Sequence, residues 1–241
     1  MSFSTVDTAP ARSWRYVGRA EVHDALTGLT LVRTTPLDDP DLWSEYLRGA
    51  HISYAKHGVE VVLDADSRHL ASETALFFVS IDGTGAVVGG VRGQGAYTSA
   101  DQSHAMTEWA GNIGREQVRD MIDSRLRDGV VEMKTAWVNA DFADAGAVAG
   151  ALARVAVPTM DAMNVRWIMA TAAEHVLRRW ESSGGRVAEH VPYAAYPDER
   201  YRTRIMWWDR RSIQVDARPD VLSRMYRDAR ALRHSAAAVA A

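Results

Sequence analysis

The sequence predicts a mixed α/β fold, in which helices cover both faces of a single twisted sheet. Two observations carry this prediction. Short apolar runs alternate with segments of helical spacing along most of the chain. One strand–helix–strand unit occupies the centre, which is typical of a parallel strand pair. The 241 residues, 47% of them hydrophobic, suffice for one domain that buries a core without disulfides.

The amino-terminal part predicts a strand, a helix and a hairpin after a polar arm at residues 1–28. Residues 29–33 form an apolar run, and a strong stop follows because Pro36 and Pro40 restrict the backbone around them. Apolar residues spaced by three and four predict a helix over residues 42–58. The hairpin is predicted from strands at 76–81 and 86–92, joined by a glycine-containing turn at 82–85.

The central and carboxy-terminal elements follow from the same patterns. Strict alternation over residues 130–138 predicts a strand with Met133, Thr135 and Trp137 on one face and Glu132 and Lys134 on the other. The remaining expectations are helices at 114–126, 145–157 (closed by Pro158), 172–182 and 219–234, and strands at 166–171, 186–191 and 201–208. We expect one domain over residues 29–215, followed by a helix with a frayed tail over 216–241.

Composition excludes several classes of function. The chain has 28 Lys and Arg against 31 Asp and Glu, so it lacks the basic footprint of a nucleic-acid-binding protein. It has no cysteine, which excludes a thiol nucleophile, cysteine-bound zinc and iron–sulfur clusters. No apolar run reaches the length of a membrane span, and no signal peptide is visible, so a cytoplasmic location is expected.

Familiar catalytic motifs do not occur. The sequence has no G-x-S-x-G elbow, no phosphate-binding P-loop and no H-E-x-x-H zinc motif. The glycines between residues 89 and 95 do not match a dinucleotide fingerprint and are interpreted as the end of a hairpin strand. The acidic segment around Asp64 and Asp66 lacks the glycine and the distal glutamate of a calcium loop. No metal site is expected.

Two charged residues in apolar strands are candidates for chemistry. Glu132 lies in the middle of a predicted strand, where a carboxylate serves either as a general base or as a salt-bridged structural group. Arg92 closes a strand of small and apolar residues, where its guanidinium suits a substrate carboxylate or phosphate. An internal pair with Asp64, Asp66 or Glu132 is the alternative for Arg92.

The serial order of these segments resembles the N-acyl homoserine lactone (autoinducer) synthases and the related N-acyl amino acid synthases. Both are divergent members of the GNAT N-acyltransferase superfamily. The resemblance covers roughly residues 40–210, and the serial order carries it rather than any single motif. The matching positions are Arg48 and Tyr54 on the first helix, the D-x-D-x-x-H segment of Asp64, Asp66 and His69, the G-x-x-R ending of the hairpin at Arg92, and the strand that carries Glu132.

The resemblance implies an N-acyltransferase with a GNAT-like domain. An acyl thioester of acyl carrier protein or coenzyme A would be the co-substrate, no bound cofactor is implied, and the acceptor would be a small-molecule amine. Glu132 would take a proton from that amine, while Arg92, Arg48, Asp64 and Asp66 would contribute to acceptor binding. Backbone N–H groups between Trp137 and Asn139 would hold the oxyanion. The acyl site would be lined by Phe77, Val79, Trp137 and Ile168.

Departures from the family pattern concern the donor. Gly146 and Gly150 mark the donor loop, although the usual phosphate-binding pattern is missing there. Asp141 and Asp144 stand where a pyrophosphate would approach a helix N-terminus, and their charge favours a carrier-protein thioester over coenzyme A. The family's E-x-x-R pattern is also broken, because Thr135 follows Lys134 at the arginine's place.

The sequence leaves alternatives for the residue that acts as general acid and for the surface that would bind a carrier protein. Trp180 occupies the place of the acid tyrosine of many GNAT enzymes, so His175 is a possible acid, with Tyr193 and Tyr196 as substitutes. In the last helix, Arg224, Arg227, Arg230 and Arg233 form a basic stripe that either docks an acidic carrier protein or is a solvated face.

Other functions remain open at the level of the sequence. One is a coenzyme-A-dependent GNAT acetyltransferase. Another is a catalytically silent binding protein. A third is other thioester chemistry on the same fold.

Overall fold

The computed structural model describes residues 18–56, 58–59 and 67–239. Within them an eight-stranded sheet has the order β1-β2-β3-β4-β5-β6-β8-β7. Neighbouring strands are antiparallel except for β5 and β6, which are parallel. The strands are β1 (Ala20–Asp24), β2 (Leu29–Thr34), β3 (Thr74–Ile81), β4 (Val87–Gly95), β5 (Val130–Val138), β6 (Trp167–Ala173), β7 (Arg186–Val187) and β8 (Thr203–Asp209).

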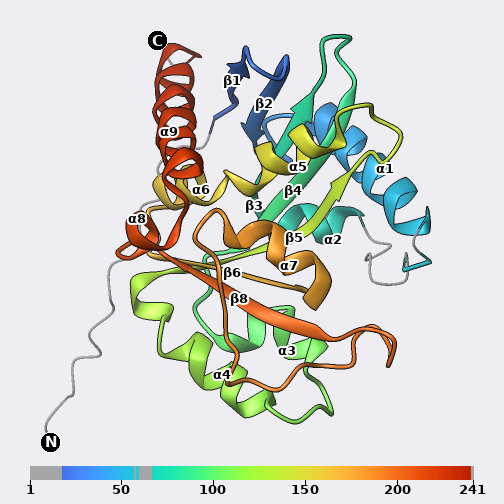
Figure 1. Ribbon diagram of the computed structural model, residues 1–241, viewed down its shortest axis with the longest axis vertical. Coiled ribbons are helices and arrows are strands. Elements are labelled where there is room, and N and C mark those ends of the chain that lie inside the picture. The colour runs from blue at the N-terminus through green and yellow to red at the C-terminus, as the bar shows by residue number, and fades with distance from the viewer. Residues whose placement is uncertain (1–17, 57, 60–66, 240–241) are drawn as a thin grey trace, which may run out of the picture.

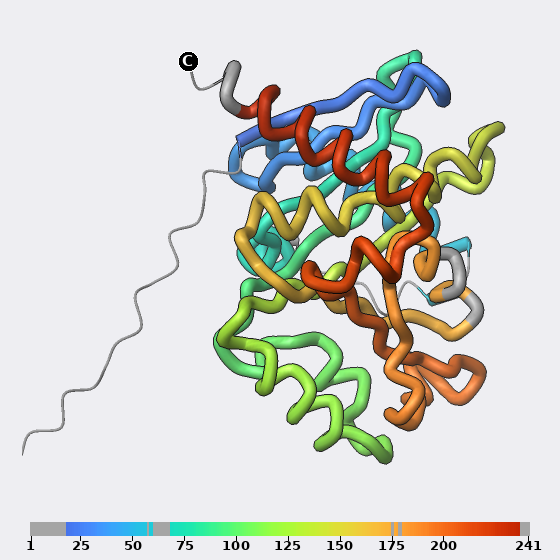
Figure 2. The backbone as a smooth tube through the Cα atoms, turned by 60° about the vertical axis from the view of Figure 1, so that its left-hand side comes forward, coloured from blue at the N-terminus to red at the C-terminus, as the bar shows by residue number. Residues whose placement is uncertain are grey.

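Helices cover both faces of this sheet, as predicted (Figure 1). One face carries α1 (Pro40–Lys56), α2 (Ser67–Glu73), α3 (Ala105–Glu108) and α4 (Arg115–Asp123). The other carries α5 (Ala145–Ala153), α6 (Ala156–Met163), α7 (Glu174–Glu181), α8 (Ile213–Asp216) and α9 (Pro219–Val239). Short 3-10 turns, η2 (Ala100–Gln102) and η3 (Leu126–Asp128), flank α3 and α4. Figure 2 shows the α3–α4 segment at the opposite end of the molecule from α9.

The predicted central strand–helix–strand unit is confirmed as β5, α5, α6 and β6. The two strands pair over a short length, where residues 130–133 face residues 167–170. Beyond that point β5 continues beside β4, and β6 continues beside β8. The two parallel strands therefore part at Lys134 and Thr171, in the middle of the sheet.

A bulge in β5 lies next to this parting. Lys134 faces Arg92, but Trp137 faces Gly90, so Thr135 and Ala136 together oppose one residue of β4. Thr135 has a φ of 52°, a left-handed conformation that is uncommon for a branched residue. The bulge reverses the alternation of the strand. The prediction that Trp137 shares a face with Met133 is therefore wrong, because Trp137 packs beneath α1.

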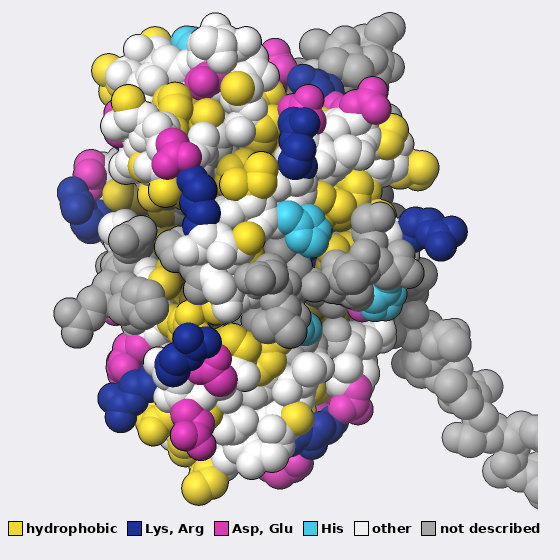
Figure 3. Space-filling model, turned by 90° about the vertical axis from the view of Figure 1, so that its right-hand side faces the viewer, with side chains coloured by type: hydrophobic (Ala, Val, Ile, Leu, Met, Phe, Trp, Pro, Cys, Tyr) yellow, Lys and Arg dark blue, Asp and Glu magenta, His cyan; other side chains and the backbone are white. Residues whose placement is uncertain are grey.

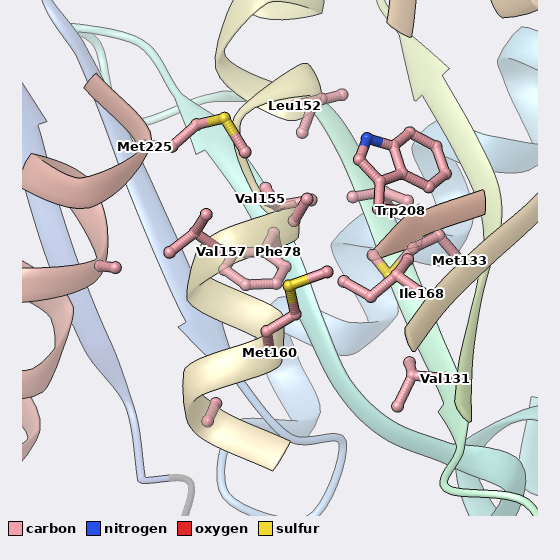
Figure 4. Close-up of a cluster of buried hydrophobic side chains, with 14 of the residues drawn as sticks. Phe78, Val131, Met133, Leu152, Val155, Val157, Met160, Ile168, Trp208 and Met225 are labelled. Atoms are coloured by element: carbon pink, nitrogen blue, oxygen red, sulfur yellow. The ribbon is translucent and has the colours of Figure 1, made fainter. Parts of the chain in front are cut away.

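The core is divided by the sheet into three clusters. Under α5, α6, α7 and α9 lies the largest, where side chains from sheet and helices fill one volume (Figure 4). The other face holds two smaller clusters, one beneath α1 around Tyr46 and Phe77, and one beneath α3 and α4 around Trp109 and Ile122. Burying each such side chain contributes roughly 1.5–3 kcal/mol. The polar residues described below lie between these two clusters.

Several element predictions need correction. The predicted helix over residues 145–157 is two helices, and Pro158 is the third residue of α6 rather than a stop. Proline is tolerated there because the first N–H groups of a helix have no partner within it. The sequence reading also did not include α2 or α3. Within residues 1–28, β1 pairs with β2 as the edge strand, and α9 contributes Met225 to the main core.

No helix among the described residues is both long and apolar enough to cross a bilayer.

Candidate active site

The candidate site is built where β5 and β6 part. Lys134 is the first residue of β5 beyond the parallel ladder, and its Nζ lies 3.0 Å from the hydroxyl of Thr171, the first residue of β6 beyond it. One face of the sheet here is polar, and the other is apolar. Parallel strands that separate leave a gap with unpaired backbone groups, which is where an extended ligand can pass between them.

Glu132 lies on the polar face and is completely buried. Its Oε2 accepts three hydrogen bonds, from the hydroxyl of Tyr97 at 2.7 Å, the hydroxyl of Ser103 at 2.9 Å and the backbone N–H of His104 at 2.9 Å. Lys134 Nζ lies 3.8 Å from Oε1. The carboxylate thus joins the strand to the η2–α3 segment.

A second buried carboxylate lies beside it. Glu108 of α3 is 4% exposed, and its Oε1 is 2.6 Å from Lys134 Nζ and 3.0 Å from Nδ1 of His104. Burial opposes ionisation of Glu108, but Lys134 and His104 outweigh it and hold the pKa of Glu108 below its usual value. Burial also opposes the charge of Lys134, but Glu108 and Glu132 outweigh burial and raise the pKa of the Lys134 ammonium. The site therefore contains a lysine ammonium between two carboxylates.

Two tyrosines complete the polar face. Burial raises the pKa of Tyr54, on α1, and that of Tyr196, in the loop before β8. The ring of Tyr196 meets the ring of His104 edge-on at 5.9 Å. Both tyrosines are neutral hydroxyls at pH 7, so they can donate or accept hydrogen bonds beside the charged groups.

Arg92 lies on the same face and is 4% exposed. Its guanidinium contacts only hydroxyls among the described residues, those of Thr135 at 3.4 Å and Thr74 at 3.3 Å. The bulge is held from the other side, because the hydroxyl of Tyr46 donates to the Thr135 carbonyl at 2.8 Å. Of the internal pairs considered for Arg92, the one with Glu132 is not formed.

The apolar face holds a small cavity of about 20 Å³. It is lined by Met133 and Ala136 of β5, Ile168 of β6, Trp180 of α7 and Trp208 of β8. Figure 4 shows Met133, Ile168 and Trp208 together at this place. Of the four residues predicted to line an acyl site, Ile168 is here. Phe77, Val79 and Trp137 belong to the cluster beneath α1 on the opposite face, so the prediction that all four line one site is wrong.

The predicted donor loop is the N-terminus of α5. The side chain of Asp144 caps this helix by accepting from the N–H of Ala147 at 2.9 Å, and Asp141 pairs with Lys56 at 2.5 Å. Gly146 lies in the first turn, and Gly150 lies further along the helix with open space around its α-carbon. A carboxylate thus already occupies the position at which a helix N-terminus binds an anion.

Other predicted site residues are placed differently. Arg48 is exposed on α1 and has no polar partner among the described residues. The backbone N–H of Asn139 donates to the Val88 carbonyl at 2.8 Å and is not free for an oxyanion. Asp64, Asp66 and the side chain of His175 lie outside the described residues.

The candidate acids and the basic stripe can be compared with their surroundings. Tyr196 reaches the polar face, whereas Tyr193 is exposed beneath the guanidinium of Arg202. Trp180 belongs to the apolar pocket.

In α9, Arg224 and Arg227 pair with Asp24, and Arg233 pairs with Asp161. Three of the four stripe arginines thus have ion-pair partners within the chain, but Asp24 also pairs with Arg154, so cations still outnumber carboxylates there. Figure 3 shows charges of both signs interspersed on another side of the molecule.

The sequence reading missed His104 and Glu108. They stand four residues apart on one side of a short helix. A histidine and a glutamate at this spacing before Trp109 were a usable signal, but the segment around them lacks the length that makes helical periodicity evident.

In the part of the chain that the structure describes, no group of three or more His, Asp or Glu side chains is arranged to hold a metal ion.

Solved structures of acyltransferases share this fold. The acyl-homoserine lactone synthase LasI aligns with a TM-score of 0.55 at 10% identity, covering 80% of this chain and 91% of that one. An N-acyl amino acid synthase from uncultured soil microbes gives 0.52 at 10% identity, with coverages of 83% and 96%. The coenzyme-A-dependent synthase BjaI gives 0.52 at 15% identity, with coverages of 87% and 99%. The fold is that of the GNAT superfamily, as the sequence predicted.

The sequence relatives of this chain share a higher percentage of identical residues with it than these solved structures do. No family model matches the chain. Uncharacterized proteins of Mycobacterium tuberculosis and Mycobacterium bovis are 51% identical to it over 211 residues, which cover 88% of this chain and 80% of each relative. The chain belongs to the family of these mycobacterial proteins.

Proposed function

We propose that the protein is an N-acyltransferase that moves an acyl group from a thioester to the amine of an amino acid or a related small molecule. The observation that carries the proposal is the parting of β5 and β6 between an apolar pocket and a polar cluster. A thioester has an apolar acyl chain and a reacting carbonyl, and an amine acceptor is polar. The fold shared with acyltransferases supports the same conclusion.

The acyl chain is assigned to the apolar pocket. Its lining of Met133, Ile168, Trp180 and Trp208 offers hydrophobic contact. The cavity of about 20 Å³ has room for roughly one water molecule in this conformation, so an acyl chain would enter it as the surrounding side chains move apart.

The acceptor is assigned to the polar face. Arg92 is a buried cation with no carboxylate partner among the described residues, so a carboxylate on the acceptor would supply one. Glu108 Oε2 is buried and has no hydrogen-bond donor among the described residues. Together these groups suit a molecule that carries both an ammonium and a carboxylate group.

The reaction proceeds by direct attack. The amine nitrogen, once deprotonated, forms a bond to the thioester carbonyl carbon, the C–S bond breaks, and the thiol leaves as thiolate. A thiol has an ordinary pKa of about 8.5, so the leaving group needs little help from an acid. An acyl-enzyme through cysteine is excluded because the chain has no cysteine.

For the donor, we infer a thioester of acyl carrier protein rather than of coenzyme A. The Asp144 carboxylate caps α5 where a pyrophosphate would bind, and like charges there disfavour coenzyme A. A carrier-protein phosphopantetheine has a single phosphodiester and meets less repulsion. The arginines of α9 pair with shared carboxylates inside the chain and give no separate support to this inference.

The test measures thiol release and product mass in one reaction. Purified protein is incubated with acetyl, isovaleryl and octanoyl thioesters of coenzyme A and of acyl carrier protein, together with each of the common amino acids. A thiol reagent reports release without background from the enzyme, which lacks cysteine. We expect an N-acyl amino acid, formed faster from the carrier-protein donor. A faster reaction from acetyl coenzyme A would instead assign a coenzyme-A-dependent acetyltransferase, and no product from any pair would contradict acyl transfer.

A further inference from the structure

We propose that His104, oriented by Glu108, is the group that takes the proton from the acceptor amine. This inference rests on the proposed acyl transfer and names the base for it. The carboxylate expected in this role from the sequence was that of Glu132. Its surroundings in the structure assign it a different task.

Glu132 is enclosed by the protein. It is completely buried, and Tyr97, Ser103 and the His104 backbone all donate to its Oε2. A base must come within hydrogen-bond reach of the proton it removes, directly or through one water molecule. Glu132 instead fixes the backbone of His104 at the start of α3, and it is a positioning residue for that histidine.

His104 combines access with orientation. Its side chain is 30% exposed, while Glu108, which it contacts through Nδ1 at 3.0 Å, is 4% exposed. Lys134 beside Glu108 keeps the pKa of that carboxyl low, so Glu108 is an ionised acceptor at neutral pH. An ionised carboxylate only accepts hydrogen bonds, so Nδ1 must carry the hydrogen. In the neutral ring Nε2 then has a free lone pair.

The groups facing the imidazole come from several elements. Glu108 is on α3, Lys134 and Glu132 are on β5, and Tyr196 is in the loop before β8. Lys134 and the buried Arg92 balance the carboxylates of Glu108 and Glu132 on this face. An imidazolium formed at His104 would be stabilised by its direct contact with Glu108.

The proton balance is simple. An N–H bond of the acceptor ammonium breaks, and the proton joins Nε2 of His104. The freed electron pair on nitrogen attacks the thioester carbonyl carbon. As the C–S bond breaks, its electron pair goes to sulfur, and the bonded nitrogen loses its second proton, which neutralises the thiolate to a thiol. The imidazolium then returns the first proton to water. Glu108 stabilises the imidazolium throughout, as carboxylates do in other histidine dyads.

The kinetic test compares His104→Ala with His23→Ala. His23 is an exposed histidine on β1, at the far edge of the sheet, and it serves as the matched control. We expect His104→Ala to lower kcat by about 10²–10⁴-fold, the usual contribution of a general base. Added imidazole should restore part of that rate, which a merely structural histidine would not allow. The control should keep the wild-type rate, and melting curves should show that both variants are folded.

A second measurement needs no substrate. Nitrogen NMR of ¹⁵N-histidine-labelled protein, assigned by His104→Gln, should show Nδ1 protonated and Nε2 bare. The opposite tautomer, or wild-type turnover that His104→Ala retains in full, overturns the base assignment and leaves acyl transfer standing. If the wild-type protein releases no thiol from any donor and acceptor pair, acyl transfer itself fails, and the base assignment falls with it.

Discussion

At the scale of single residues, the polar face is held together by buried carboxylates with specific partners. The clearest case is Glu132, whose one oxygen accepts three hydrogen bonds from a segment that is distant in sequence. A buried donor that loses its acceptor costs roughly 1–3 kcal/mol. The stability of the η2–α3 segment on the sheet therefore depends on this side chain.

Replacement of Glu132 should lower the free energy of unfolding. Glu132→Ala leaves three buried donors without an acceptor, and we expect a loss of about 3–5 kcal/mol in the free energy of unfolding. Glu132→Gln keeps an accepting oxygen and should lose less. Urea denaturation at pH 7 measures both. Equal stability of Glu132→Ala and wild type would contradict the positioning role.

The stability contributed by Glu108 should depend on pH. Its pKa is lower in the folded protein than in the unfolded chain, so the folded state is favoured while the carboxyl is ionised. That contribution is complete above the ordinary carboxyl pKa of about 4.3. It is lost as the pH falls from there toward the lower folded value. The difference in unfolding free energy between wild type and Glu108→Gln, followed by urea denaturation from pH 7 to pH 3, should shrink with acidity, and a constant difference would contradict the ion pair.

Sequence reasoning identified part of this site. The sequence indicates Glu132 and Arg92 as candidates because charged residues in apolar strands are unusual, and both lie on one face of the sheet. His104 and Glu108 were missed because their helix has four residues, too few for a hydrophobic period. The partners of a charge are set by tertiary packing across 26 residues or more, which local patterns do not record.

At the scale of elements, α1 lies unusually close to the sheet. Gly49 of α1 faces the indole of Trp137, and a β-carbon at this glycine would lie 2.1 Å from that ring. On the strand side, a β-carbon at Gly90 would meet the ring of Tyr46 at 2.6 Å. Glycines at these two places let the helix and the sheet approach each other.

A glycine pair tests this close approach. Gly49→Ala should destabilise the protein by about 1–3 kcal/mol through overpacking, although alanine favours a helix. Gly150→Ala is the matched control, because Gly150 lies inside α5 and a β-carbon added there would meet no side chain or neighbouring element within 4 Å. We expect this control to raise stability by up to about 1 kcal/mol. Thermal unfolding of both proteins measures the difference, and a stabilising Gly49→Ala would show that α1 is not packed this tightly.

Element patterns were predictable from the sequence, but their irregularities were not. The hairpin, the long strand at residues 130–138 and the last helix follow from periodicity and turn residues. The bulge at Thr135 was missed because the residue does not favour positive φ, and tertiary contacts with Tyr46 and β4 impose it. The break between α5 and α6 was missed because both segments have the same small apolar composition.

At the scale of the whole molecule, a buried ion network joins the two ends of the chain. Arg154, just after α5, pairs with Asp24 of β1 at 3.1 Å and with Asp228 of α9 at 2.8 Å. Arg224 of α9 also reaches Asp24 at 3.1 Å. The network fixes α9 against the edge strand and the end of α5. It also pairs Arg224 and Arg227 of α9 with Asp24.

Removal of the central cation should be costly. Arg154→Met leaves two buried carboxylates without their main partner, and we expect a loss of about 3–5 kcal/mol in unfolding free energy. Arg200→Met is the control, because Arg200 forms an exposed pair with Asp198 that is worth at most about 1 kcal/mol. Chemical denaturation of the two variants should show this contrast. Equal losses would contradict a special role for the network.

The proposed acyl site is the apolar cavity on one side of the gap between β5 and β6. Ala153→Leu adds volume to the wall of that pocket without touching the polar face. The measurement is the ratio of initial rates with octanoyl and acetyl donors in this variant and in wild type. We predict that the ratio falls by at least about tenfold, the factor that 1.4 kcal/mol gives, while acetyl transfer continues. An unchanged ratio of octanoyl to acetyl rates in a folded, active variant would contradict the placement of the acyl chain in this cavity.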